Sequence, residues 1–330
     1  MPTRISPILC GTVLFICLGA PLLNAQQGAS SQVVASDGAG GVVITRPHTY
    51  LGSGADLSPN GRQLVYIGAD NGLYILDTEK RNERLLIRQT KDGMTVFSDP
   101  IFSSAGDTVY FVASGGTSSY PSNIYSIILA NGQARQLTHA AQNKEDVSAK
   151  TSDDVSMWRP YKQYFSMPIP SPDGSGRLLV RVRDAVQEKD LVEILDTSAG
   201  TLMAIGEGTP LAWDASGTRA YYRTDEGVDV LDVSDHLLIR TLKTNNGVVV
   251  GVVDDNVVQV RDGELTISGG ARLATLHISV NRHLSIKGTQ AQADEILSLR
   301  QIQQTPDGKR RLTVYDNGTF EQIEVTEIAR

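Results

Sequence analysis

Cysteine is absent from the chain except in its first 25 residues, which hold Cys10 and Cys17. If that segment is removed, the protein has no disulfides and no thiolate metal ligands, so burial and sheet hydrogen bonds must stabilise it. Aromatic residues are also scarce, at 6% of 330 residues. Hydrophobic residues nevertheless make up 40%, enough to build a core, which excludes a largely disordered chain.

The chain also lacks a surplus of basic residues. Its formal net charge is −7 at pH 7, and removal of Arg4 with the first 25 residues makes it −8. A mildly acidic surface argues against nucleic acid or an anionic membrane as the main partner. Two short basic runs, Lys80-Arg81 and Lys309-Arg310-Arg311, flank expected hairpin strands. We interpret them as solvated edge positions.

Residues 1–25 have the pattern of a secretory signal peptide. Arg4 precedes an apolar run from Ile8 to Leu23, and the small residue Ala25 marks the expected cleavage site. An uncleaved membrane anchor is the alternative, because the run approaches the shortest length that spans a bilayer. We therefore predict a periplasmic or secreted protein without stable membrane insertion after cleavage. Residues 26–41, rich in Gln, Gly, Ala and Ser, are expected to form a flexible leader.

One kind of turn recurs along residues 42–330, each time before an aliphatic strand. The five turns are Ser58-Pro59-Asn60-Gly61, Ser103-Ser104-Ala105-Gly106, Ser171-Pro172-Asp173-Gly174, Asp214-Ala215-Ser216-Gly217 and Thr305-Pro306-Asp307-Gly308. Their glycines are separated by 45, 68, 43 and 91 residues. The longest interval spans two periods, with a degenerate hairpin at Val248 to Val260 midway. The 68-residue interval holds one period and an insertion at about 139–167.

Four short strands fit into each period, a pattern that is typical of a propeller blade. The clearest copy is Asp99 to Thr138, which predicts a four-stranded antiparallel sheet. We predict an all-β fold, a single six-bladed β-propeller over residues 42–330. Seven blades are the alternative, because Ala271 to Gln304 shows the repeat poorly. Ile296 to Ile302 is expected to be the innermost strand of the last blade, and Val42 to Thr45 would pair with the C-terminal strands to close the ring.

The segment from Asn123-Ile124-Tyr125 to Arg135-Gln136-Leu137-Thr138, together with the Ser-Pro-Asp-Gly turns, resembles the WD40-like propeller repeat of the TolB family. The resemblance covers residue 42 to the C-terminus and implies the propeller fold. Similar propellers precede the hydrolase domain of prolyl-oligopeptidase-type peptidases. No Gly-x-Ser-x-Gly nucleophile elbow occurs in this sequence, so neither family's full activity is carried over.

The polar residues of the repeat do not form a recognisable catalytic or metal-binding pattern. Asp and Asn in the turns are expected to bond their own backbone. The five histidines show no pair at ligand spacing; they are His48, His139, His236, His277 and His283. Oxygen ligands for calcium are present around residues 254–264, but their spacing matches no EF-hand, and hairpin turns account for them. We predict no catalytic residue, no metal site and no cofactor.

The insertion is the sequence feature that points to function. It carries the candidate binding residues Trp158, Arg159, Tyr161, Tyr164 and Phe165. Long loops are often functional, and Trp, Tyr and Arg are enriched at binding hot spots. The alternative is that these aromatics pack beneath the loop.

We therefore expect an exported, monomeric, non-catalytic propeller that acts as a scaffold for an envelope or secreted protein or peptide. Two other functions stay open. The first is an enzyme with a metal-dependent, hydrolase- or lactonase-type site in the central channel. The second is a stand-alone relative of a peptidase-associated gating propeller.

Overall fold

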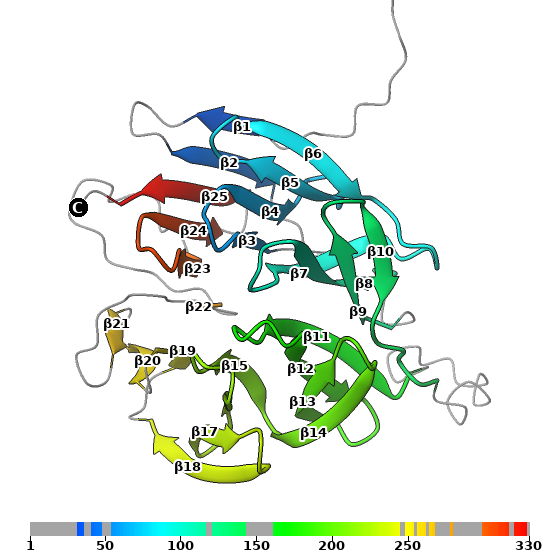
Figure 1. Ribbon diagram of the computed structural model, residues 1–330, viewed down its shortest axis with the longest axis vertical. Helices are drawn as coiled ribbons and strands as arrows, with labels where there is room; N and C mark the ends of the chain where they lie inside the picture. The colour runs from blue at the N-terminus through cyan, green and yellow to red at the C-terminus, as the bar shows by residue number, and fades with distance from the viewer. Residues whose placement is uncertain are drawn as a thin grey trace, which may run out of the picture.

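The computed structural model describes residues 32–35, 41–47, 54–116, 121–142, 161–244, 248–253, 256–261, 264–267, 278–279, 299–316 and 320–328. Within these ranges the chain forms strands and turns but no helix, so no helix there could cross a membrane. The strands make six antiparallel sheets with the arrangement of propeller blades (Figure 1). The expected all-β propeller fold is confirmed. The signal peptide lies outside the described residues.

Four sheets contain four strands each, in chain order, as the repeat predicted. The first has β3 (Ala55–Leu57), β4 (Gln63–Ile67), β5 (Leu73–Asp77) and β6 (Asn82–Ile87); the second has β7 (Val96–Phe102), β8 (Thr108–Ser114), β9 (Asn123–Ile128) and β10 (Gln133–Gln136). The third has β11 (Gln163–Pro170), β12 (Arg177–Asp184), β13 (Lys189–Asp196) and β14 (Thr201–Glu207); the fourth has β15 (Thr209–Trp213), β16 (Arg219–Arg223), β17 (Gly227–Asp232) and β18 (Leu237–Lys243). In each of them, the first strand contacts the first strand of the next sheet.

The fifth sheet contains the degenerate hairpin that the sequence indicated. Its described strands are β19 (Val248–Val253), β20 (Asn256–Arg261) and β21 (Glu264–Ile267). Asp254, Asp255 and Asp262, whose oxygens were attributed to hairpin turns rather than to a calcium site, lie outside the described residues.

The sixth sheet joins the two ends of the chain. Its order is β1 (Gln32–Ala35), β2 (Val42–Pro47), β25 (Phe320–Glu327), β24 (Arg310–Asp316), β23 (Leu299–Gln304) and β22 (Ile278–Ser279). Ile44 pairs with Ile323 and Val42 with Val325, so the expected pairing of N- and C-terminal strands is present. The number of blades and the closure of the whole ring stay predictions.

Two boundaries in this sheet differ from the sequence expectation. Gln32–Ala35, inside the range expected to be a flexible leader, forms β1 and pairs with β2, because Val33 and Val34 are β-branched residues that suit an edge strand. The strand before the last turn ends at Gln304 rather than at Ile302; its described part is Leu299–Gln304, and Ile296 lies outside the described residues.

The core lies between neighbouring sheets. Phe97 and Phe111, from the second sheet, pack edge to face with ring centroids 5.6 Å apart, and Val65 and Ile75 of the first sheet belong to the same cluster. Because both faces of a blade are covered, strands such as β8 are buried along almost their whole length. Each such side chain contributes about 1.5–3 kcal/mol on burial.

The two ends of the blades differ in their connections. At one end, which we call the turn end, lie the turns between the first and second strands of each sheet. Successive turns touch: the Cβ position at Gly106 would lie 3.3 Å from Pro59, and that at Gly61 lies 3.1 Å from Thr305. At the other end, the connection end, lie the hairpins between second and third strands and the long connection between the second and third sheets.

The turns are capped by their own side chains, as expected. Ser171 Oγ donates to Asp173 Oδ1 at 2.7 Å, and Thr305 Oγ1 donates to Asp307 Oδ1 at 2.7 Å. The five turn glycines have φ between 68° and 74°, in the left-handed region where glycine is favoured. The polar turn residues therefore have a local structural role.

Polar side chains also link the first strands of neighbouring sheets. Asp56 Oδ2 on β3 accepts a 2.7 Å hydrogen bond from Phe102 N on β7, and Asp99 Oδ2 on β7 accepts one of 3.3 Å from Met167 N on β11. Trp213 Nε1 on β15 donates to the Ile169 carbonyl on β11 at 2.9 Å. Burial raises the pKa of Asp56 to about 8, and burial also raises the pKa of Asp99.

Candidate functional site

Buried polar atoms without hydrogen-bond partners gather at the connection end. Of the atoms of this kind in the described residues, five lie in side chains of this end: Arg46 Nη1, Asn71 Oδ1, Arg181 Nε, Asp190 Oδ1 and Thr224 Oγ1. Native proteins rarely leave buried polar groups unpaired, so each one needs a reason. The connection end is therefore the candidate binding region.

Two of these atoms belong to one cluster on the third sheet, which we call the Arg181 cluster: Tyr164, Arg181, Arg183 and Asp190. Arg181 Nη2 donates to Asp190 Oδ2 at 2.6 Å. Arg183 Nη1 lies 3.6 Å from Asp190 Oδ1, too far for a hydrogen bond. The exposed fractions of the side chains are 31% for Arg181, 43% for Arg183 and 25% for Asp190. Two cations therefore share one carboxylate at a partly open site.

The strand pairing explains why these residues meet. Arg181 and Arg183 are two residues apart on β12, so both point to the same face of the sheet. Arg183 lies opposite Asp190 of β13 and opposite Tyr164 of β11. This face is directed toward the fourth sheet, because Leu179, on the same face of β12, and Val192, the cross-strand partner of Arg181, pack there.

The structure describes three of the five residues that the sequence predicted for binding. Tyr161 forms an isolated bridge with Gln142 at the base of the long connection and is half-buried. Tyr164 is half-buried in the Arg181 cluster. Phe165 is 1% exposed and packs between the second and third sheets, so its side chain belongs to the core. Trp158 and Arg159 lie outside the described residues.

The insertion is also shorter than expected at its C-terminal side. Gln163 begins β11, so residues 163–167 of the expected insertion are part of the third sheet, and the connection ends at Lys162. Lys162 N donates to the Ala141 carbonyl at 2.8 Å, which holds the two sides of the connection together at its base.

The sequence did not single out Arg181, Arg183 or Asp190. A partial signal was present at Arg181, because the turns align it with Ile67, Val112 and Val314 of other sheets, although the fourth sheet has Arg223 there. With the hairpin register fixed by its turn, Arg183 could have been paired with Asp190.

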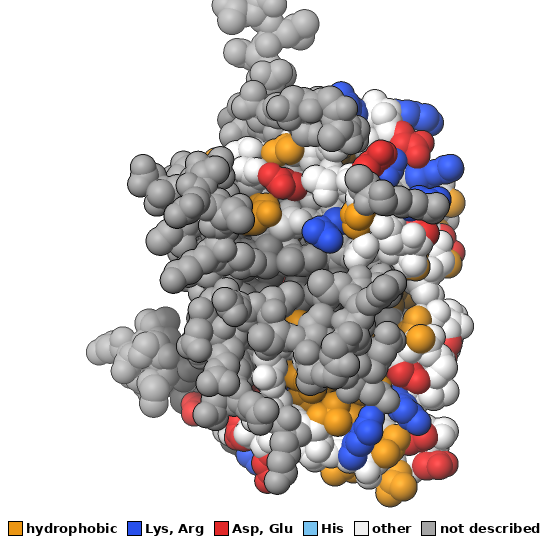
Figure 2. Space-filling view, turned by 90° about the vertical axis from the view of Figure 1, so that its left-hand side faces the viewer, with side chains coloured by type: hydrophobic (Ala, Val, Ile, Leu, Met, Phe, Trp, Pro, Cys, Tyr) orange, Lys and Arg blue, Asp and Glu red, His pale blue; other side chains and the backbone are white. Residues whose placement is uncertain are grey.

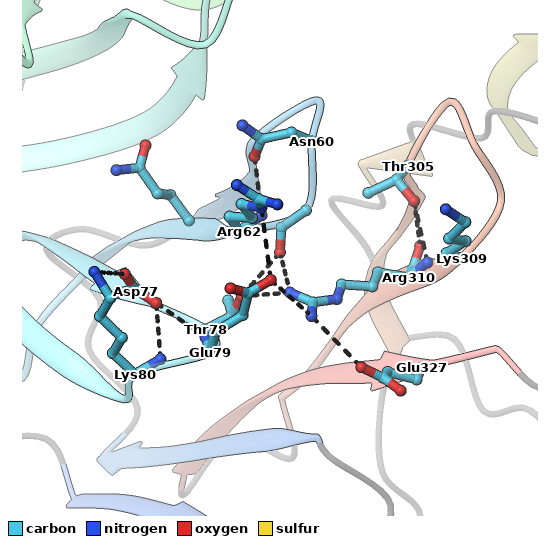
Figure 3. Close-up of polar contacts among 12 residues, drawn as sticks. Asn60, Arg62, Asp77, Thr78, Glu79, Lys80, Thr305, Lys309, Arg310 and Glu327 are labelled. Atoms are coloured by element: carbon cyan, nitrogen blue, oxygen red, sulfur yellow. Dashed lines mark hydrogen bonds and ion pairs between the residues drawn. The ribbon is translucent and has the colours of Figure 1, made fainter.

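A second arginine cluster, at the turn end, is arranged differently (Figure 3). Arg310 Nη1 donates to the Gly61 carbonyl at 2.7 Å and to Thr78 Oγ1 at 2.6 Å, and its Nη2 lies 3.5 Å from Glu327 and 3.6 Å from Glu79. Its side chain is 17% exposed. Arg310 was expected at a solvated edge. Instead it links the sixth sheet to the first, because Gly61 leaves room for its stem.

Among the described residues, no group of three His, Cys, Asp or Glu side chains is placed to hold a metal ion. The alternative function, a metal-dependent enzyme with its site in the central channel, stays open.

An apolar edge is also exposed. Leu237, Leu238 and Ile239 are 62%, 49% and 43% exposed on β18, the last strand of its sheet. Figure 2 shows hydrophobic side chains at this level of the molecule, among charged ones. An edge strand of this kind can pair with another chain, but nothing in the structure shows what would cover it.

Comparisons with known proteins give fold-level similarity only. No protein-family profile and no curated protein sequence matches the chain. Among solved structures, TolB from Acinetobacter baumannii aligns with 16% identity and a TM-score of 0.41, over 56% of this chain and 42% of TolB. This chain thus spans less than half of that protein. The β-propeller domain of the Trilobed protease from Pyrococcus furiosus aligns with 13% identity and a TM-score of 0.40, over 71% and 83% of the two chains.

Dipeptidyl peptidase 4 from Porphyromonas gingivalis aligns with 11% identity and a TM-score of 0.45, over 83% of this chain and 42% of the peptidase. The structures to which this chain is similar are thus TolB and other β-propeller proteins.

Proposed function

We propose that the chain is an exported, non-catalytic β-propeller that binds a protein or peptide of the cell envelope or the secreted fraction. The contact surface is the connection end, at the base of the long connection near Tyr161 and Tyr164. Trp158 and Arg159, adjacent in sequence, add residue types that are common at binding hot spots. The observation that carries the proposal is the Arg181 cluster, a partly open site whose polar groups are incompletely paired.

The contacts of the acidic residues on the first strands of the sheets support a binding role rather than catalysis. Asp56 and Asp99 each accept a hydrogen bond from the backbone of the next sheet. A carboxylate used in this way holds two blades together. By contrast, Arg181 and Arg183 pair with Asp190 of their own sheet, and the site is open to solvent on one side.

Site-specific crosslinking in cells tests the proposal. A photoreactive amino acid replaces Tyr161 in the full chain, which is expressed and exported in its host, and crosslinked products are identified by mass spectrometry. The matched control carries the same amino acid at Ala199, which is exposed in the hairpin at the turn end of the same sheet. Thr197 N in that hairpin bonds the Gly176 carbonyl, which fixes its place at the turn end.

We expect one reproducible partner from position 161 and none from position 199. Trp158→Ala should reduce the yield at position 161. Equal products from both positions, or no product from either, would contradict the proposal. N-terminal sequencing of the exported protein tests the export step, with a new terminus expected after Ala25. An intact terminus found on a cytoplasmic protein would refute it.

A further inference from the structure

We propose that the Arg181 cluster is a carboxylate-binding site, with Arg183 as the group that receives the carboxylate of a bound peptide. This inference rests on the proposed binding function and names the chemistry that the partner must offer at this place. Its basis is the difference between the hydrogen-bonding capacity of the cluster and the bonds that it makes.

Arg183 has almost all of its donors available. A guanidinium group has five N–H donors in a planar fork. Within the described part of the chain, Arg183 makes one ion contact, the 3.6 Å approach to Asp190 Oδ1, and 43% of its side chain is exposed. A carboxylate fits this fork with two parallel hydrogen bonds, which is the pairing that arginine favours.

The local charge also favours an anion. Arg181 and Arg183 carry two positive charges, and Asp190 supplies one negative charge to both; the buried Asp99 on β7 also interacts electrostatically with Arg181. The neighbouring Asp184 is already used, because its Oδ1 accepts bonds from Val186 N and Gln187 N at 2.8 Å each. A further carboxylate would pair with Arg183, and at partial burial such a pair is less screened than on an open surface.

Asp190 and Arg181 act as positioning residues. The 2.6 Å bond from Arg181 Nη2 holds Asp190 Oδ2, so that Oδ1 faces Arg183. Arg181 Nε and Asp190 Oδ1 are both buried and without hydrogen-bond partners. A ligand that draws Arg183 closer to Asp190 would allow Asp190 Oδ1 to form a hydrogen bond. Ligand binding would therefore explain why this buried oxygen is unpaired in the free protein.

Tyr164 gives the site an organic wall. It lies directly opposite Arg183 in the strand pairing and is half-buried. An aromatic ring beside a guanidinium suits the carbon atoms next to a peptide carboxylate better than a bare inorganic anion. The site is therefore suited to a C-terminal carboxylate or an acidic side chain of an extended peptide.

The test uses small probes and the signals of the arginines themselves. The exported protein is labelled with ¹⁵N-arginine, and the Nε–Hε signals are followed as N-acetylalanine, N-acetylglutamate amide or N-acetylalanine amide is added. The first probe offers a C-terminal carboxylate, the second a side-chain carboxylate, and the third no carboxylate. Inorganic phosphate at matched ionic strength is the fourth arm.

We expect saturable shifts of the Arg183 and Arg181 signals with one or both carboxylates and none with the amide. The stronger carboxylate identifies the source. Arg183→Gln should weaken binding about tenfold or more. The control Arg62→Gln should not change it, since Arg62 also has one 3.6 Å acid contact but lies at the turn end, with 69% of its side chain exposed.

Three results would overturn the inference: no saturable shift with either carboxylate, equal shifts with phosphate or with the amide, and unchanged affinity in Arg183→Gln. The crosslinking from position 161 is independent of all three. If it captures a partner while the carboxylates do not bind, the proposed function stands and the carboxylate site falls. If no partner is captured, the proposed function itself fails.

Discussion

Within the single strand β12, one arginine is fully used and another is almost unused. Arg177 begins the strand at the turn end, where its Nη2 donates to the Gly217 carbonyl at 2.9 Å and to Asp173 Oδ2 at 2.8 Å. Its guanidinium carbon also lies 5.4 Å from the ring centroid of Trp213. Arg183, near the other end of the strand, makes one long ion contact. The two ends of a blade thus treat the same residue type differently.

The difference follows from what surrounds each end. At the turn end, a short glycine turn from the next sheet lies close enough for an arginine to reach its carbonyl: Arg177 reaches Gly217, and Arg310 reaches Gly61. At the connection end the chain makes hairpins and one long connection, and among the described residues no backbone turn of the next sheet accepts a bond from Arg183. We infer that the turn end serves assembly of the blades, and that the connection end keeps polar groups for a ligand.

The largest expected effect is at a buried pair of the connection end. The side chain of Arg46 is fully buried and pairs with Glu321, which lies opposite it on β25. Glu321→Ala leaves a buried cation without its partner, so we expect a loss of about 3–5 kcal/mol in the free energy of unfolding. Urea unfolding measures it, with Glu327→Ala as the exposed control. A change below about 1 kcal/mol would mean that water reaches Arg46.

A buried acid on a first strand, Asp56 of β3, should make the free energy of unfolding depend on pH by a comparable amount. Burial raises the pKa of Asp56 to about 8 from an ordinary value near 3.8, so the folded state binds its proton more tightly than the unfolded state does. This contribution to stability is complete below about pH 4 and is lost as the pH rises to about 8. The slope is at most about 1.4 kcal/mol per pH unit. Asp99, whose pKa is also raised, acts in the same direction.

Unfolding free energies measured between pH 4 and 9, in the wild type and in Asp56→Asn, test this dependence. The variant should show a flatter profile over that window, because its amide does not titrate. Parallel profiles in the two proteins would show that Asp56 is not the titrating group.

The turn end gives a smaller effect. Arg310→Met keeps the apolar stem but removes the two hydrogen bonds to the first sheet. Because hydrogen bonds from a charged group contribute about 1.5–3 kcal/mol and part of the loss is compensated by water, we expect about 1–3 kcal/mol of destabilisation. Thermal and urea unfolding measure it. Arg311→Met, at an exposed position of the same strand, is the control and should change little.

The sheets were predictable because their signals are local. Each turn such as Ser171-Pro172-Asp173-Gly174 caps itself, and the alternating apolar strands around it form the same hairpin in any context. The pairing of Val42 to Thr45 with the C-terminal strands was also predictable, since a ring of repeats with one strand missing at one end needs it at the other.

The site was less predictable because its contacts depend on neighbouring strands and sheets. Arg310 looked like a solvated basic residue, yet its hydrogen-bond partner Gly61 is 249 residues away in sequence. Phe165 was predicted to be a binding residue, but the register of β11 directs it into the core, while Tyr164 points to the opposite face. A shift of one residue would exchange the two roles, and no composition rule fixes that register.

The smallest expected effect completes the comparison between the two ends. Arg183→Gln removes a cation that has one long ion contact and is 43% exposed, so we expect the free energy of unfolding to change by no more than about 0.5 kcal/mol. Removal of a turn-end arginine such as Arg310 should lower the free energy of unfolding several times more. Arg183 and Arg310 both lie on the strand that follows the recurring turn of a blade, so their residue type and strand do not explain the difference. A residue that contributes little to folding but is required for carboxylate binding belongs to the ligand site rather than to the scaffold. If Arg183→Gln destabilised the protein as much as Arg310→Met, the two ends would be alike, and Arg183 would be a structural residue.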